Sequence, residues 1–145
     1  MKLKTFLEQN KYSSTTFERI KTNHIQIKAE VNGIKGVFII DTGASNSCID
    51  LENYHLFKIF PEESSEKASS ATDEISKTMI SKKNKIKIGK WIRKNVSIVL
   101  FDMSFINKTL EEHGAKSVNG IIGADLLKKG KGIIDYSGKK LFLKI

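Results

Sequence analysis

The fold of this chain is decided by the stretch Gly36-Val37-Phe38-Ile39-Ile40-Asp41-Thr42-Gly43-Ala44-Ser45. Its first five residues form an apolar run that is typical of a buried strand, and Asp41 follows this run in a tight turn. The strand therefore carries a carboxylate out of the core to a place where it is available for chemistry. Because an Asp-Thr-Gly triplet is short enough to occur by chance, its setting decides its meaning.

Each residue of this turn has an expected role. Gly43 allows backbone conformations that a side chain forbids and lets another chain approach closely. Thr42 offers a hydroxyl that both donates and accepts, which suits it to hold the turn. Ala44 continues the turn, and Ser45 is expected as a turn or helix-cap residue. The alternative is an Asx turn, in which Asp41 only bonds the backbone two residues further on.

A second segment lies near the C-terminus, in Asn119-Gly120-Ile121-Ile122-Gly123-Ala124-Asp125-Leu126-Leu127. The pattern predicts a short apolar strand, a glycine, and then a helix with Asp125 as its N-cap and Gly130 as its C-terminal stop.

Together, the two segments resemble the retropepsin-like aspartic proteases. In that family the active-site triplet follows a hydrophobic strand, and two later apolar residues plus glycine pack beneath it. Asp41, Thr42 and Gly43 match the triplet, and Ile121, Ile122 and Gly123 match the second element. The resemblance covers residues 24–145, which are expected to form the protease domain, and leaves residues 1–23 as an N-terminal arm or extension.

The resemblance implies a peptide or protein substrate and two carboxylates that share one proton. This chain has one Asp-Thr-Gly, and its other aspartates, at positions 50, 73, 102, 125 and 135, precede neither Thr-Gly nor Ser-Gly. The second carboxylate is therefore expected from a second copy, in a homodimer whose two Asp41 residues meet on the two-fold axis. Because Ala44 lacks a hydroxyl that favours the charged carboxylate, the pair should keep its proton to higher pH than in a hydroxyl-bearing relative.

The resemblance also implies a flap over the substrate, expected between about Ser64 and Ile75. Its substrate-binding residues would be Ala68, Ser69, Ser70 and Ala71. This stretch lacks the glycines typical of retroviral flaps, so a surface loop that covers nothing is an equal alternative.

We expect an all-β fold, a closed retropepsin-like (acid protease) barrel with one or two short helices. Asn32-Gly33 is a hairpin signal, and Ser104 is expected to cap a helix over residues 105–113. Strands are expected over residues 15–20, 25–31, 35–40, 75–81, 85–88 and 95–101, with a final hairpin over 132–145.

Composition favours a cytoplasmic globular protein. No apolar run approaches the roughly 20 residues needed to span a membrane, and the N-terminus lacks the features of a signal peptide. The single Cys48 is expected to be a buried structural thiol. His24, His55 and His113 are scattered, so no metal site is expected, and no cofactor motif is present.

The net charge of +9 raises a different class of function, because eight of the eighteen residues from Lys77 to Lys94 are Lys or Arg. Such a stripe could bind nucleic acid, but Lys-Ile alternation is also typical of a half-exposed strand. We expect an aspartic endopeptidase. The alternatives are a noncatalytic protein of the same fold that binds peptides or a partner chain, and a basic nucleic-acid-binding module.

Overall fold

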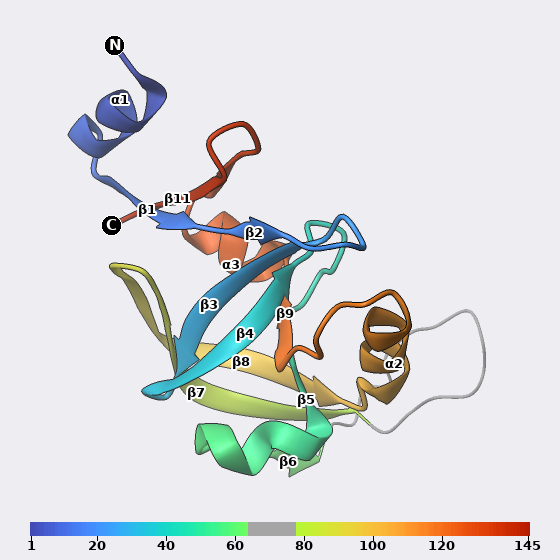
Figure 1. Cartoon of the computed structure of the whole chain (residues 1–145). Helices are drawn as coiled ribbons and strands as arrows, with labels where there is room; N and C mark the ends of the chain where they lie inside the picture. The colour runs from blue at the N-terminus through green and yellow to red at the C-terminus, as the bar shows by residue number, and fades with distance from the viewer. Residues whose placement is uncertain (64–77) are drawn as a thin grey trace.

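A computed structural model of the chain describes residues 1–63 and 78–145 (Figure 1). The expected flap residues Ala68, Ser69, Ser70 and Ala71 lie outside the described residues, as does the first part of the strand expected over residues 75–81.

The centre of the fold is a closed barrel of six strands, as expected from the sequence. Neighbouring strands follow one another around the ring, and pairing of β3 with β7 closes it. In ring order, the strands are β3 (Ile25–Val31), β4 (Ile34–Ile40), β9 (Gly120–Ile122), β5 (Cys48–Asp50), β8 (Trp91–Phe101) and β7 (Met79–Ile88).

The first hairpin of the barrel follows directly from the sequence. Asn32 and Gly33 both have positive φ, at 52° and 85°, and the register pairs Val31 with Ile34 on either side of them. A two-residue turn with positive φ at both positions matches the right-handed twist of the strands, which explains why Asn-Gly occurs here. The end of β4, from Phe38 to Ile40, is buried on both faces.

One long strand replaces the two strands expected over residues 75–81 and 85–88. β7 runs without a break from Met79 to Ile88, and irregular pairing with β8 around Asn84 absorbs the polar interruption. Asn84 is buried because its amide binds the Ser81 carbonyl and hydroxyl and the Val96 carbonyl. Hydrogen bonds to Ser81 and to the neighbouring strand therefore satisfy a buried amide that lies between the two expected strands.

A second, three-stranded sheet joins the two ends of the chain, and we call it the terminal sheet. Its order is β1 (Tyr12–Thr16), β11 (Lys140–Lys144) and β10 (Ile133–Asp135). Figure 1 shows helix α1 (Leu3–Gln9) beyond β1, at the far end of this sheet. The first sixteen residues are thus tied to the C-terminal hairpin.

The remaining elements are short. They are β2 (Glu18–Arg19), the 3-10 helix η1 (Leu51–Phe57), β6 (Glu62–Glu63), α2 (Ser104–Glu112) and α3 (Ala124–Lys129). Two expected caps are wrong. Ser104 is the first residue of α2 and donates its N–H to the Asp102 carboxylate, and Gly123 rather than Asp125 precedes α3.

Candidate active site

The Asp41 turn, residues 41–47, connects β4 to β5, and β9 lies between these two strands. β9 runs parallel to β4, with Ile39 opposite Ile121 and Ile40 opposite Ile122, and antiparallel to β5. The two segments that the sequence singled out are therefore neighbours in the barrel. Gly120 permits this insertion, because a Cβ at that position would collide with the Cys48 carbonyl.

Asp41 itself is exposed at the start of the turn. Its Oδ1 accepts the Gly43 N–H at 2.9 Å, and its carbonyl accepts the Ala44 N–H at 3.1 Å. The first of these bonds is the Asx turn considered above, and it holds the carboxylate in one orientation. Gly43 does not have positive φ, so the expected conformational need for glycine is absent.

The backbone beneath the turn comes from β9 and the start of α3. The Asp41 N–H donates to the Ile122 carbonyl at 2.9 Å, and the Ala124 N–H donates to the Ala44 carbonyl at 2.7 Å. A Cβ on Gly123 would lie 2.6 Å from the Ala44 carbonyl oxygen, closer than real Cβ atoms come to other atoms. Only glycine lets α3 begin so close under the turn.

The far end of the Asp41 turn is held by Asp125. The carboxylate accepts the Ser47 N–H at 3.0 Å from each oxygen and the Ser47 hydroxyl at 2.7 Å. The hydroxyl in turn accepts the Gly123 N–H at 2.9 Å, and Oδ1 also accepts the Leu126 N–H at 2.8 Å. From the sequence we expected a role for Asp125 in α3 alone, because nothing local marks Ser47 as its partner.

A polar hollow of about 170 Å³ opens beside Asp41, and we call it the Asp41 hollow. Residues from three separate parts of the chain line it, namely Asn23, His24, Ile25, Ile40, Asp41, Thr42, Ile134 and Tyr136. His24 is held by a 2.7 Å hydrogen bond between its Nδ1 and the Thr22 hydroxyl. Sequence reasoning did not find His24, Ile134 or Tyr136, since each comes from a segment with no motif.

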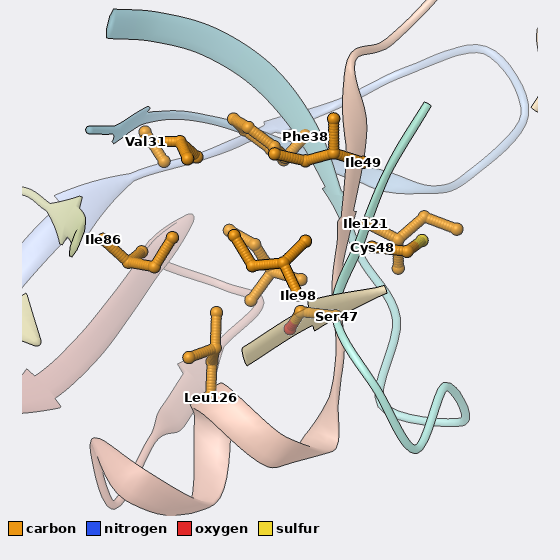
Figure 2. A pocket seen from close by; sticks show the side chains of 11 residues that line it. Val31, Phe38, Ser47, Cys48, Ile49, Ile86, Ile98, Ile121 and Leu126 are labelled. Atoms are coloured by element: carbon orange, nitrogen blue, oxygen red, sulfur yellow. The ribbon is translucent and has the colours of Figure 1, made fainter. Parts of the chain in front are cut away.

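Cys48 directly follows the Asp41 turn, as the first residue of β5, and is shielded from solvent. Figure 2 shows its side chain beside Ile121, away from Ile98 and Leu126 in the main core. Burial raises the pKa of its thiol from 9.0 to about 12. Since the thiolate is the nucleophile, this cysteine is inert, and the expected structural role fits its environment.

The small void in Figure 2 is not a peptide site. It measures about 20 Å³ and is lined mostly by apolar core residues, so it has room for no more than one water. In the described parts of the chain, no three His, Cys, Asp or Glu side chains are grouped to hold a metal ion. No described helix is long and apolar enough to cross a membrane.

Part of the basic stripe lies on β7, further described residues of it lie at the turn after β7 and on β8, and Lys77 lies outside the described residues. Lys85 and Lys87 are exposed, whereas Ile86 and Ile88 between and after them are buried. Lys87 also lies 3.8 Å from Glu30 on the neighbouring strand. The alternation is therefore that of a strand with one face in water.

Comparison with known protein families identifies the family of this chain. A family model described as aspartyl protease matches residues 27–126, which include both β4 with the Asp41 turn and β9 with the start of α3. The chain belongs to this aspartyl protease family. No curated protein sequence matches the chain.

Solved structures share the retropepsin-like fold of this aspartyl protease family member. A retropepsin-like aspartic protease from Rickettsia conorii matches at 20% identity and a TM-score of 0.62, covering 91% of this chain and 90% of that chain. EIAV protease, in complex with the inhibitor HBY-793, matches at 16% identity and a TM-score of 0.54, covering 72% and 85%. The retroviral protease-like domain of Ddi1 from Leishmania major matches at 12% identity and a TM-score of 0.55, covering 90% and 89%.

Proposed function

We propose that this chain is an aspartic endopeptidase that works as a homodimer, with Asp41 of each copy contributing one catalytic carboxylate. The observation that carries the proposal is the exposed Asp41, held on a turn that β9 and α3 support from below and open to a polar hollow. Membership of the aspartyl protease family agrees with it.

The proposed chemistry needs two carboxylates that share one proton, because like charges close together cannot both ionise cheaply. The ionised carboxylate takes a proton from a water molecule as its oxygen bonds to the scissile carbonyl carbon. The protonated carboxyl donates to the carbonyl oxygen. The C–N bond then breaks while the amide nitrogen receives a proton, which leaves an acid and an amine. A single Asp41 cannot hold both roles at once.

The other described aspartates lie outside the Asp41 hollow and serve local structure, which favours a second copy as the source of the second carboxylate. Each accepts at least one backbone N–H: Asp50 from Glu52 and Met103, Asp102 from Ser104, Asp125 from Ser47 and Leu126, and Asp135 from Gly138. None of these four lines the Asp41 hollow.

The test is hydrolysis of a mixed peptide library by the purified chain and by Asp41→Asn, with Asp102→Asn as a matched control at an exposed loop. Asp41→Asn should abolish cleavage without loss of fold, because an amide is not a general base. Specific activity of the unmodified chain should also rise with protein concentration through the range in which it dimerises. Cleavage retained by Asp41→Asn would overturn the proposal.

Binding measurements on the unmodified chain, with peptides and with nucleic acid, separate the two alternatives. Peptide binding without cleavage by the unmodified chain would point to the noncatalytic member of the fold. A noncleaving chain whose affinity for nucleic acid falls steeply with salt would point to the basic module, since phosphate contacts are strongly salt-dependent.

A further inference from the structure

A second polar hollow lies at the opposite ends of the strands that flank the Asp41 turn. β5 leaves that turn and ends at Asp50, whose N–H donates at 2.9 Å to the carbonyl of Asn119, the residue before β9. The hollow measures about 350 Å³, and we call it the Asp50 hollow. Its lining comes from Asp50 and η1, from α2 and from residues 117–119, and it shares no residue with the Asp41 hollow.

Side-chain hydrogen bonds fix the walls of the Asp50 hollow. Asn107 on α2 donates its Nδ2 to the Val118 carbonyl at 3.2 Å and accepts the Val118 N–H at 2.8 Å. Asn119 donates its Nδ2 to Oδ1 of Asn53 on η1 at 3.1 Å and accepts the Val37 N–H at 2.9 Å. Segments that are distant in the sequence are therefore held around the hollow, and a preformed site of this kind loses little free energy to ordering when a ligand binds.

Asp50 has a carboxylate oxygen without a partner, although the residue is only 6% exposed. Its Oδ1 accepts the N–H groups of Glu52 and Met103, both at 3.3 Å. Within residues 1–63 and 78–145, Oδ2 accepts no hydrogen bond, and no side-chain oxygen or nitrogen that is sealed from solvent lacks a partner. Oδ2 therefore faces accessible space, and Asp50 lines the hollow. Because a nearly buried carboxylate is costly unless its oxygens are paired, this oxygen points to a ligand that donates.

The charge of the Asp50 hollow is opposite to that of the whole chain. Its lining holds three carboxylates, of Asp50, Glu52 and Glu111, and one ammonium, of Lys108, which gives a formal charge of −2 against +9 for the chain. The ion pairs between described residues lie elsewhere, so Lys108 neutralises none of these carboxylates by direct contact. The hollow therefore attracts a cation on a molecule that otherwise repels cations.

The lining suits an organic cation better than a metal ion, since no three metal-ligating side chains of the described residues are grouped to hold one. A guanidinium group carries five N–H donors in a planar fork and is more weakly hydrated than an ammonium group. The free acceptors here are Asp50 Oδ2 and the carboxylates of Glu52 and Glu111, which come from different elements. A ligand whose donors point in several directions fits such an arrangement.

We propose that the Asp50 hollow binds a guanidinium group, with Asp50 Oδ2 as the inner acceptor and Glu52 and Glu111 as the outer carboxylates. The group belongs to an arginine side chain of a peptide or to a free small molecule of the arginine type, because both present the same fork of donors. This site goes beyond the proposed hydrolysis, since it is separate from the Asp41 hollow.

The experiment is titration calorimetry with N-acetyl-arginine amide. This probe should bind the unmodified chain, whereas its citrulline analogue, which has a similar shape but no charge, should not. The lysine analogue should bind more weakly than the arginine probe. Tighter binding of a pentapeptide with one central arginine among alanines would assign the group to a peptide, and weaker binding would assign it to a small molecule. Asp41→Asn should bind the probe as the unmodified chain does.

Glu111→Gln tests the outer carboxylates, and Glu112→Gln is its matched control. Both glutamates are exposed on α2, but only Glu111 lines the hollow. Glu111→Gln should weaken binding of the arginine probe about threefold, as expected for the loss of one exposed charge pair. Adding Glu52→Gln should weaken it roughly tenfold in total, and Glu112→Gln should leave it unchanged.

An NMR titration of the unmodified chain locates the probe without any substitution. The amide signals of Glu52 and Met103, which donate to Asp50, should shift, and those of Gly43 and Ala44 beside Asp41 should not. The proposal would be overturned by no binding, by shifts at Gly43 and Ala44 alone, by a citrulline or lysine analogue that binds as well as the arginine probe, or by equal effects of Glu111→Gln and Glu112→Gln. None of these readouts depends on hydrolysis, so failure of this site is distinct from failure of the Asp41 assignment.

Discussion

Replacing Asp125 with alanine should weaken the fold and misplace Asp41, although the two side chains do not touch. Asp125 accepts two groups of Ser47, the N–H at 3.0 Å and the hydroxyl at 2.7 Å. Ser47 is 3% exposed, so water does not replace the lost acceptor. An unsatisfied buried donor costs about 1–3 kcal/mol, and two of them give about 3 kcal/mol after partial relaxation.

This loss should be visible in thermal unfolding and in kinetics. For a chain of this size, about 3 kcal/mol corresponds to a fall in Tm of about 10 °C. Because the Asp41 turn loses its far support, kcat should fall by on the order of 100-fold while KM changes little. Asp125→Asn keeps one acceptor oxygen, so it should lower Tm and kcat less than Asp125→Ala does. The assay is differential scanning calorimetry together with initial rates on one peptide.

The controls test whether the losses of stability and of kcat in Asp125→Ala arise from its hydrogen bonds to Ser47. Asp102 also accepts a helix N-terminal N–H, from Ser104 at 2.8 Å, but it is exposed, so Asp102→Ala should lower Tm less and leave kcat unchanged. Combined with Ser47→Ala, Asp125→Ala should be non-additive by about 1–2 kcal/mol, as expected for residues in direct contact. If Asp125→Ala behaves like Asp102→Ala, or adds fully with Ser47→Ala, the reasoning is refuted.

Three shorter predictions follow from the same region. Gly123→Ala should lower both Tm and activity, because the Cβ of the new alanine would lie 2.6 Å from the Ala44 carbonyl oxygen. An unchanged Tm would show that α3 can shift to relieve this contact. Ala44→Ser should move the upper limb of the rate against pH to lower pH, because a donated hydroxyl stabilises the ionised pair and lowers its upper pKa; an unchanged or raised limb would contradict contact with the pair. Cys48 should resist alkylation at pH 8 until the chain unfolds. Since its folded pKa of about 12 exceeds the ordinary 9.0, its contribution to stability is present below pH 9 and is lost between pH 9 and 12, which pH-dependent melts would reveal.

Local physical chemistry made several features predictable from the sequence. The apolar run before Asp41 and the Ile121-Ile122 pair could only be buried strands, and Asn32-Gly33 has the dihedral freedom that a two-residue hairpin needs. The end of α3 at Gly130 was also predictable. In each case the information lies within a few neighbouring residues.

Other features were decided only by the tertiary structure. Phe105 lies in the helix expected over residues 105–113, and its side chain is 81% exposed, because α2 instead buries Leu110, which joins Met103 and Val118 in a hydrophobic cluster. The N-terminal strand β1 pairs with β11 across more than a hundred residues, and no local pattern marks that partner.

The hydrogen bonds between Ser47 and Asp125 show why some features could be predicted from the sequence and others only from the tertiary structure. Ser47 and Asp125 are 78 residues apart in the chain, and their hydrogen bonds exist only because β9 enters the barrel between β4 and β5. Dihedral preferences and hydrophobic period act over one turn or one strand, so they identified the residues that form the Asp41 turn. Which side chain holds that turn depends on where the folded chain brings a distant donor and acceptor together, and a buried donor must find such a partner wherever it lies.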